Sequence, residues 1–113
     1  LIRECQKAIV MAEEAGISVE LIDLRTIYPI DRETIVNSIK KTGRVVIVAE
    51  ASESFSVGSE LMAIANEEAF LSLEAPPKRV MGFDTIVPLA QGEPYYMIFP
   101  DRIFYEIEKT AKF

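Results

Sequence analysis

The sequence predicts an α/β domain of three layers, α/β/α, with a mostly parallel sheet and helices on both of its faces. Segments with apolar residues at helical spacing alternate along the chain with short apolar segments. Two of the short segments are almost continuously apolar, as is typical of strands buried on both faces. Half of the 113 residues are apolar and only five are glycine. We therefore expect one folded domain over residues 1–113, large enough to bury its own core.

Four helices are predicted from apolar spacing and from residues that commonly begin or end a helix. Gly16 stands where a glycine often ends a helix. Asp31 is a predicted N-cap with Thr34 three positions later, and Pro100 suits the first position of the last helix. The expected helices cover 2–15, the stretch from the Asp31 cap to "KKTG" at 40–43, 57–73 and 101–112.

Three strands are predicted, over 17–24, 44–49 and 78–81. The segment "ISVELIDL" at 17–24 alternates at first and then becomes continuously apolar, which indicates a strand buried on both faces at its far end. Three strands are few for a doubly wound sheet, and the chain begins on a helix. Either a strand before the first helix has been lost, or it lies outside these 113 residues.

The stretch 85–99 is predicted to be an ordered loop, because proline and glycine recur in it at short intervals. Aromatic residues in and after this loop have two possible roles, a patch that binds a partner or a small satellite core under the loop. The satellite core is the favoured interpretation. The residues concerned are Tyr95, Tyr96, Phe99, Phe104 and Tyr105.

Composition excludes several classes of function. A net charge of −6 and scattered basic residues argue against a nucleic-acid binder. No apolar run approaches the roughly 20 residues that a membrane-spanning helix needs. One cysteine and the lack of a recognisable export signal favour a reducing compartment such as the cytoplasm.

Catalytic and metal-binding residues are not predicted. The chain has no histidine, which removes the commonest general base and nitrogen ligand for metals. Cys5 lies on the inner face of a predicted helix, where a buried structural thiol is the favoured interpretation. No CxxC motif, metal-spaced cluster or phosphate-binding loop occurs. We therefore assign no catalytic, cofactor-binding or metal-binding residue to this chain.

Most of the candidate binding residues follow the strand at 44–49 in "VVIVAEASESFSVGSEL", and Asp84 follows the strand at 78–81. Carboxyl ends of parallel strands share one edge of a sheet, so carboxylates at strand ends, Asp23 among them, could line a polar crevice. Free backbone N–H groups at the start of the next helix could hold an anion. The alternative is that these groups only cap helices and pair with arginine. The residues proposed for partner docking or anion binding are Glu50, Ser56, Gly58, Ser59 and Asp84.

Residues 16–88 resemble the C-terminal domain of the β subunit of thiamine-diphosphate-dependent 2-oxo acid dehydrogenases, the pyruvate or branched-chain type. The most specific matches are "IDLRTIYPID" at 22–31, "GSELMAIANEEAF" at 58–70 and "APPKRVMGFDTIVP" at 75–88. The C-terminal domains of transketolase and deoxyxylulose phosphate synthase share the fold. Their sequences normally lack the last of these elements in this form, so the dehydrogenase is preferred.

The resemblance implies a role in assembly rather than in chemistry. The complete enzyme decarboxylates a 2-oxo acid oxidatively and passes the acyl group to lipoyl, using thiamine diphosphate and magnesium held between the α subunit and the N-terminal domain of the β subunit. The expected partners are those two regions, a second β subunit and the dihydrolipoyl acyltransferase core. In some members the terminal carboxylate of the β chain takes part in docking, and Phe113 would carry that group here. The isolated chain is expected to be inactive. The complete enzyme is expected in the cytoplasm, or in the mitochondrial matrix of a eukaryote.

Two departures from the family pattern matter. Many relatives have a histidine directly before the glutamate that ends the 44–49 strand, whereas this chain has Ala49 before Glu50. Relatives also carry a strand just before the first helix, near the middle of the sheet. Its absence implies an incomplete domain, oligomeric or only marginally stable by itself, because inner strand edges are left unpaired. The alternative function is a free-standing α/β module that binds a small anionic ligand or regulator.

Overall fold

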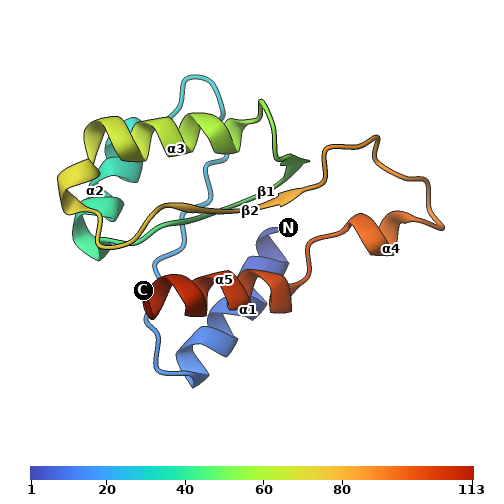
Figure 1. Ribbon diagram of the computed structural model, residues 1–113, viewed down its shortest axis with the longest axis horizontal. Helices are drawn as coiled ribbons and strands as arrows, with labels where there is room; N and C mark the ends of the chain where they lie inside the picture. The colour runs from blue at the N-terminus through green and yellow to red at the C-terminus, as the bar shows by residue number, and fades with distance from the viewer.

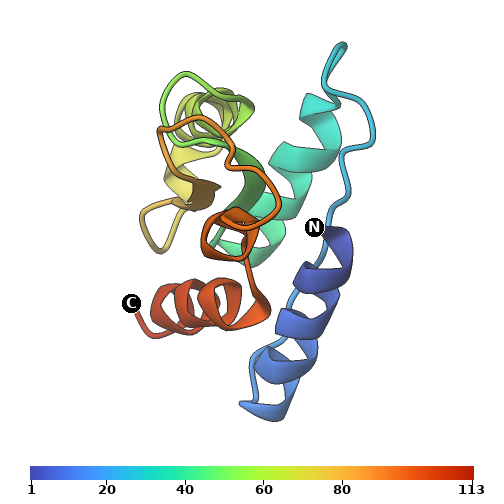
Figure 2. The same cartoon turned by 90° about the vertical axis from the view of Figure 1, so that its right-hand side faces the viewer.

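A computed structural model describes all 113 residues as a three-layer α/β/α domain, as predicted (Figure 1). Helices α2 and α3 lie on one side of a short parallel sheet, and α1 and α5 lie on the other (Figures 1 and 2). No strand precedes α1. The elements in order are α1 (Ile2–Glu14), α2 (Arg32–Thr42), β1 (Val46–Ser52), α3 (Val57–Glu68), a 3₁₀ turn (Phe70–Ser72), β2 (Lys78–Gly82), α4 (Glu93–Tyr96) and α5 (Pro100–Ala111).

The sheet consists of two parallel strands, β1 and β2. Their register runs from Val46 opposite Lys78 to Ala49 opposite Met81, after which β1 bulges and Ser52 pairs with Gly82. The connection passes over the sheet as α3, which is the helical crossover that parallel strands require. Both strands lie where the apolar runs predict them.

Helix α2 shows how local sequence fixes an element. The carboxylate of Asp31 accepts hydrogen bonds from the backbone N–H of Thr34 at 3.0 Å and from its hydroxyl at 2.7 Å. Both bonds lower the pKa of Asp31 because they favour its charged form. At the other end Gly43 adopts φ +70°, the left-handed conformation that ends many helices. The predicted N-cap is confirmed.

Two apolar clusters cover the two faces of the sheet. One joins α2 and α3, and the other joins α1, α5 and the inner residues of β2. The buried members of the first are Ile35, Val36, Ile39, Ile64, Ala65 and Ala69, and those of the second are Cys5, Ala8, Val80, Ile98 and Ile103.

Several sequence expectations are wrong in detail. Residues 17–24 are extended but form no strand, because no neighbouring backbone pairs with them. The helix predicted over 57–73 ends at Glu68 and is followed by a 3₁₀ turn. The aromatic loop contains the short helix α4, and of the predicted satellite core only Tyr96 is fully buried.

No helix is both long enough and apolar enough to cross a membrane.

Candidate functional site

The candidate site is the edge of the domain where β1 and β2 end. Residues 53–56 lead from β1 into α3, and residues 83–92 leave β2 on the same side (Figure 1). The structure therefore brings Ser56, Gly58, Ser59 and Asp84 to one edge, as the parallel arrangement predicts. Phe55, at the tip of the first loop, is fully exposed and has φ +53°.

Asp84 ties the two loops together. Its carboxylate accepts a hydrogen bond from the backbone N–H of Ser54 at 2.9 Å and another from the Ser54 hydroxyl at 2.6 Å. These two bonds, the side-chain one first, lower the pKa of Asp84 because they stabilise the ionised carboxylate. Asp84 is thus ionised at neutral pH and joins one loop to the other.

Arg79 makes a second bridge across the same edge. Its guanidinium donates to the backbone carbonyl of Glu53 at 2.7 Å and to the hydroxyl of Ser59 at 3.1 Å. It also lies 3.6 Å from the Glu53 carboxylate. Three segments, the β1–α3 loop, the start of α3 and β2, are therefore held by one side chain.

The start of α3 is packed closely against β2. A methyl group added at Gly58 would lie 2.9 Å from the sulfur of Met81, so glycine allows the helix to approach the strand. Ser56 is the N-cap residue, but its hydroxyl makes no capping bond and is buried without a partner. Gly58 therefore allows the close packing of α3 against β2.

Two proposed residues stand apart from this network. Glu50 is exposed, has no ion-pair partner and lies at the mouth of a cavity beside β1. Phe113 follows α5 at the opposite end of the molecule and is 74% exposed (Figure 1). The carboxylate of Phe113 therefore belongs to a different surface from the strand-end loops.

The sequence reasoning missed Ser54 and Arg79. Ser54 lies in the serine-rich loop and gives no signal that distinguishes it from its neighbours. Arg79 is one of the scattered basic residues, although its place at the second position of β2 predicts a side chain directed at α3. The roles of both residues become visible only in the structure, where the loop after β1 lies against β2 and the loop that follows it.

The chemistry available at this edge is limited. It offers carboxylates, hydroxyls and one arginine, with no nucleophile beside a base. Cys5, the single thiol, lies in the α1–α5 cluster, where burial raises its pKa and keeps it protonated. No three acidic, histidine or cysteine side chains lie close enough together to bind a metal ion. The arrangement suits a rigid surface for contacts.

The chain is similar to known proteins along its whole length. It is 53% identical over 112 residues to the pyruvate dehydrogenase E1 component subunit beta of Acholeplasma laidlawii, covering 99% of this chain and 34% of that protein. The subunit of the same name from Staphylococcus aureus (strain Mu50 / ATCC 700699) is 44% identical over 113 residues, covering 100% of this chain and 35% of that protein.

A solved structure shares the fold. The chain described as "Split gene transketolase, inactive beta4 tetramer" matches with a TM-score of 0.81 at 25% identity, over 97% of this chain and 35% of that one. The chain thus spans about a third of the length of the relatives it matches. The family model for the transketolase C-terminal domain matches residues 1–103, and the chain belongs to that family.

Proposed function

We propose that this chain is the C-terminal assembly domain of the β subunit of a pyruvate dehydrogenase E1 component. The observation that carries the proposal is the 53% identity over 112 residues to an E1 β subunit. In this role the domain associates with other subunits and leaves the oxidative decarboxylation and acyl transfer to the complete enzyme. The preference for pyruvate rests on the names of the relatives alone.

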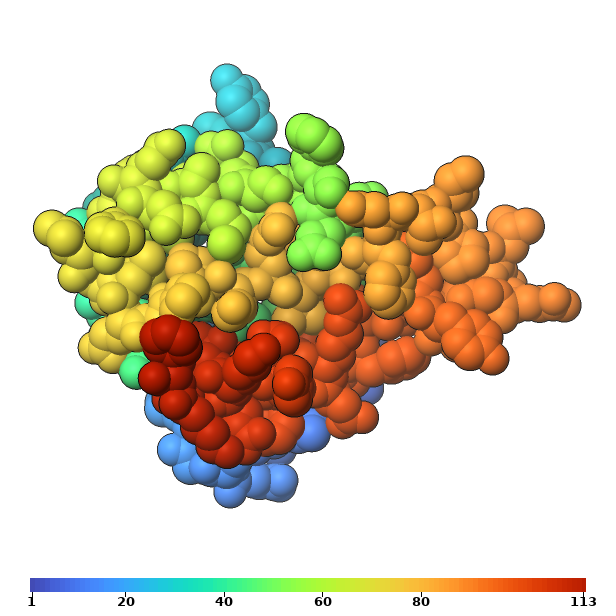
Figure 3. Space-filling model, in the orientation of Figure 1, coloured from blue at the N-terminus to red at the C-terminus, as the bar shows by residue number.

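An exposed apolar arm supports a role in assembly. We define the arm as residues 83–99, which project from the body of the domain and are orange in Figure 3. A monomer rarely exposes so many large apolar side chains on one segment unless they meet a partner. Those at least half exposed are Phe83, Ile86, Val87, Leu89, Tyr95 and Phe99.

The arm is held by its base. Tyr96 is buried, and its ring lies edge-on to Phe83 with centroids 6.2 Å apart. Arg102 of α5 lies over the Phe83 ring at 5.3 Å. A surface fixed in this way loses little conformational entropy on binding, which favours association.

Thiamine diphosphate and magnesium belong to the complete enzyme in this proposal. The residues present do not fit the cofactor, because no metal-binding cluster exists and the guanidinium of Arg79 is already engaged by Glu53 and Ser59. The proposed partners are the α subunit, the N-terminal domain of the β subunit, a second β subunit and the acyltransferase core, in the cytoplasm of a bacterium.

The proposal is tested in the complete β subunit. Leu89→Lys places a charge on the arm at a side chain that is 89% exposed, so the domain should still fold. We expect co-elution with the α subunit or with a second β subunit to weaken, together with enzyme activity. Leu71→Lys is the matched control, because Leu71 is 98% exposed on the 3₁₀ turn, away from the arm. Unchanged assembly in Leu89→Lys, with other arm variants also silent, would refute the proposal.

The alternative, an anion-binding module at Ser56–Ser59, has less support. The hydroxyl of Ser59 already accepts a hydrogen bond from Arg79, and the side chain of Met81 occupies the space beside Gly58. The side chains of Glu53 and Asp84 also place negative charge on the same edge. An anion would meet these carboxylates before it reached the helix.

A further inference from the structure

One side chain connects the outer part of the arm to the body of the domain. Residues 84–95 include no buried residue, and all of their hydrogen bonds stay within the arm except the two that Asp84 accepts. Both come from Ser54, in the loop that leads from β1 into α3. This loop, in green, and the start of the arm, in orange, lie side by side in Figure 3. We call Asp84 and Ser54 the clamp.

The other end of the arm is anchored by packing. Tyr96 is 6% exposed, and its hydroxyl oxygen lies so close to Gly82 that a methyl group there would be 2.5 Å away. The tip of the arm is a closed turn, because the backbone N–H groups of Gly92 and Glu93 both donate to the carbonyl of Leu89. The arm is therefore ordered at its tip and packed at its far end, and the clamp fixes the direction in which it leaves β2.

The clamp also holds the neighbouring loop in a strained conformation. Phe55 directly follows Ser54, has φ +53° and is fully exposed. The left-handed region is unfavourable for a phenylalanine, and an exposed ring has no packing to offset that cost. The bonds from Ser54 to Asp84 and from Arg79 to the Glu53 carbonyl hold the two residues before it. Strain held in this way by the surrounding structure is typical of functional sites.

We propose that Asp84 is a positioning residue for assembly, which acts through Ser54 to hold the arm in the pose that meets the partner subunit. This role rests on the assembly function proposed above. An arm that is already ordered loses less conformational entropy when the partner binds. Removing the clamp should therefore weaken association about five- to tenfold. The core should stay folded, because Asp84 and Ser54 are both exposed.

The test compares two aspartates with the same bonding in the complete β subunit. Asp31 accepts the same two kinds of bond from Thr34, at 3.0 Å from its backbone N–H and at 2.7 Å from its hydroxyl, but it caps α2 outside the arm. Asp84→Ala and Asp31→Ala each remove one such pair, so both should lower the melting temperature. Dissociation constants for the α subunit and for a second β subunit are measured by analytical ultracentrifugation. We expect Asp84→Ala alone to raise the constant for the contact that the arm makes.

Milder variants at the clamp keep the comparison measurable if Asp84→Ala fails to fold. Ser54→Ala removes only the hydroxyl bond, so it should weaken association less than Asp84→Ala does. Ser54→Thr keeps a hydroxyl and should restore association. Asp84→Asn keeps an oxygen that can accept from the Ser54 N–H, so it should associate more tightly than Asp84→Ala.

Hydrogen–deuterium exchange of the free β subunit reports the order of the arm itself. Asp84→Ala should speed the exchange of amides in residues 53–56 and 84–92, whereas Asp31→Ala should do so only at the start of α2. Faster exchange in the arm with unchanged association would show that the clamp has a structural role only, and would overturn the inference.

Leu89→Lys is measured beside these variants so that two kinds of failure can be told apart. If Leu89→Lys weakens association and neither Asp84→Ala nor Ser54→Ala does, the arm is a contact that the clamp does not position, and only the present inference is overturned. Equal weakening by Asp84→Ala and Asp31→Ala would trace the effect to a general loss of stability and overturn it also. If Leu89→Lys and the other arm variants leave association unchanged, the assembly function fails and the positioning role fails with it.

Discussion

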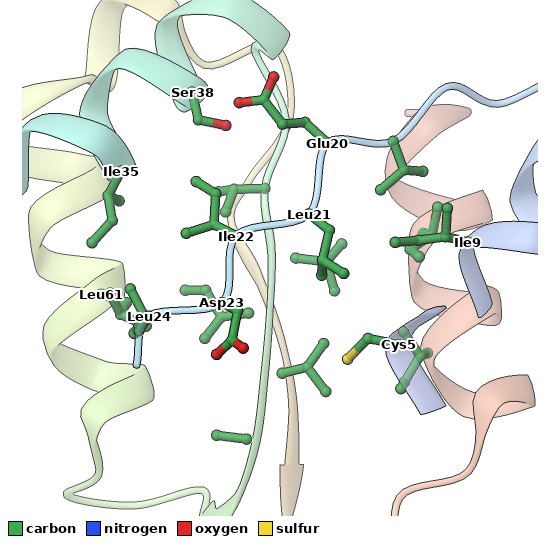
Figure 4. Close-up of a pocket in the computed structure, with 18 of the residues that line it drawn as sticks. Cys5, Ile9, Glu20, Leu21, Ile22, Asp23, Leu24, Ile35, Ser38 and Leu61 are labelled. Atoms are coloured by element: carbon green, nitrogen blue, oxygen red, sulfur yellow. The ribbon is translucent and has the colours of Figure 1, made fainter. Parts of the chain in front are cut away.

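The two edges of β1 have opposite environments. On one edge β2 pairs with it residue by residue, and side chains such as Val80 and Met81 are 1% exposed. On the other edge no strand pairs with β1, and an apolar cavity lies beside it, lined by Leu21, which is 40% exposed (Figure 4). β1 therefore has one paired edge and one unpaired edge.

The difference shows that apolar sequence alone does not make a strand. Segment 17–24 has a larger share of apolar residues than β2, yet it forms no ladder. β2 has a neighbouring strand whose backbone lies at hydrogen-bonding distance, and segment 17–24 has none. Stability should therefore be concentrated on the β2 side of the domain.

The largest effect on stability is expected at Ile98, which is 1% exposed and packs with Val80 on the β2 side of the domain. Ile98→Ala should lower the free energy of unfolding by about 2–5 kcal/mol, because it removes buried methyl groups and leaves a cavity. Urea denaturation followed by circular dichroism measures this loss.

Ile98→Val provides a milder step at the same site, with an expected loss of about 0.5–1.5 kcal/mol. It remains measurable if the alanine variant is unfolded. A loss for Ile98→Ala below that of Leu21→Ala would contradict the idea that stability is concentrated on the β2 side.

A smaller effect is expected from overpacking at the end of β2. A methyl group at Gly82 would lie 2.5 Å from the Tyr96 hydroxyl oxygen and 3.0 Å from the backbone carbonyl of Ala51, so it is confined from two sides. Gly82→Ala should cost about 1–3 kcal/mol in thermal or urea unfolding.

Gly58→Ala is the matched control for that substitution. Its methyl group would lie 2.9 Å from the sulfur at the flexible end of the Met81 side chain and 3.5 Å from the Arg79 side chain, with no backbone atom as close. Methionine can move aside more easily than backbone, so the loss should be smaller. Equal losses for the two variants would show that the Ala51 carbonyl does not restrict the site.

Asp84 should give a pH-dependent effect. Its pKa is lowered in the folded chain by the bonds from Ser54, so its contribution to stability is full above the ordinary value of 3.8 and is lost as the pH falls through the lowered pKa. Asp84→Asn should therefore melt at a lower temperature than the parent near neutral pH, and the difference should shrink in acid. A difference that is constant with pH would contradict this role.

The sequence predicted the elements better than their pairing. Asp31, Gly43 and Pro100 mark helix ends through local hydrogen bonding and backbone conformation, so their effects are visible in a short stretch of sequence. Segment 17–24 was predicted as a strand because its apolar pattern is correct, but a strand also needs a neighbour that this chain does not place beside it.

The candidate site was predicted only in part, for a similar reason. Ser56, Ser59 and Asp84 could be placed at one edge from topology, because the ends of parallel strands coincide. The bonds from Ser54 to Asp84 and from Arg79 to Glu53 join residues about 26 to 30 positions apart in the chain. Such pairs follow from the exact loop paths, for which the sequence holds no local signal.

The smallest effect on the chain alone is expected at Leu21. Leu21→Ala should change the free energy of unfolding by about 1 kcal/mol or less, because the side chain is not part of a packed core. Urea denaturation followed by circular dichroism measures this change beside that of Ile98→Ala. A loss of stability as large as that of Ile98→Ala would show that Leu21 is packed in solution as tightly as the core and that the two edges of β1 are equivalent.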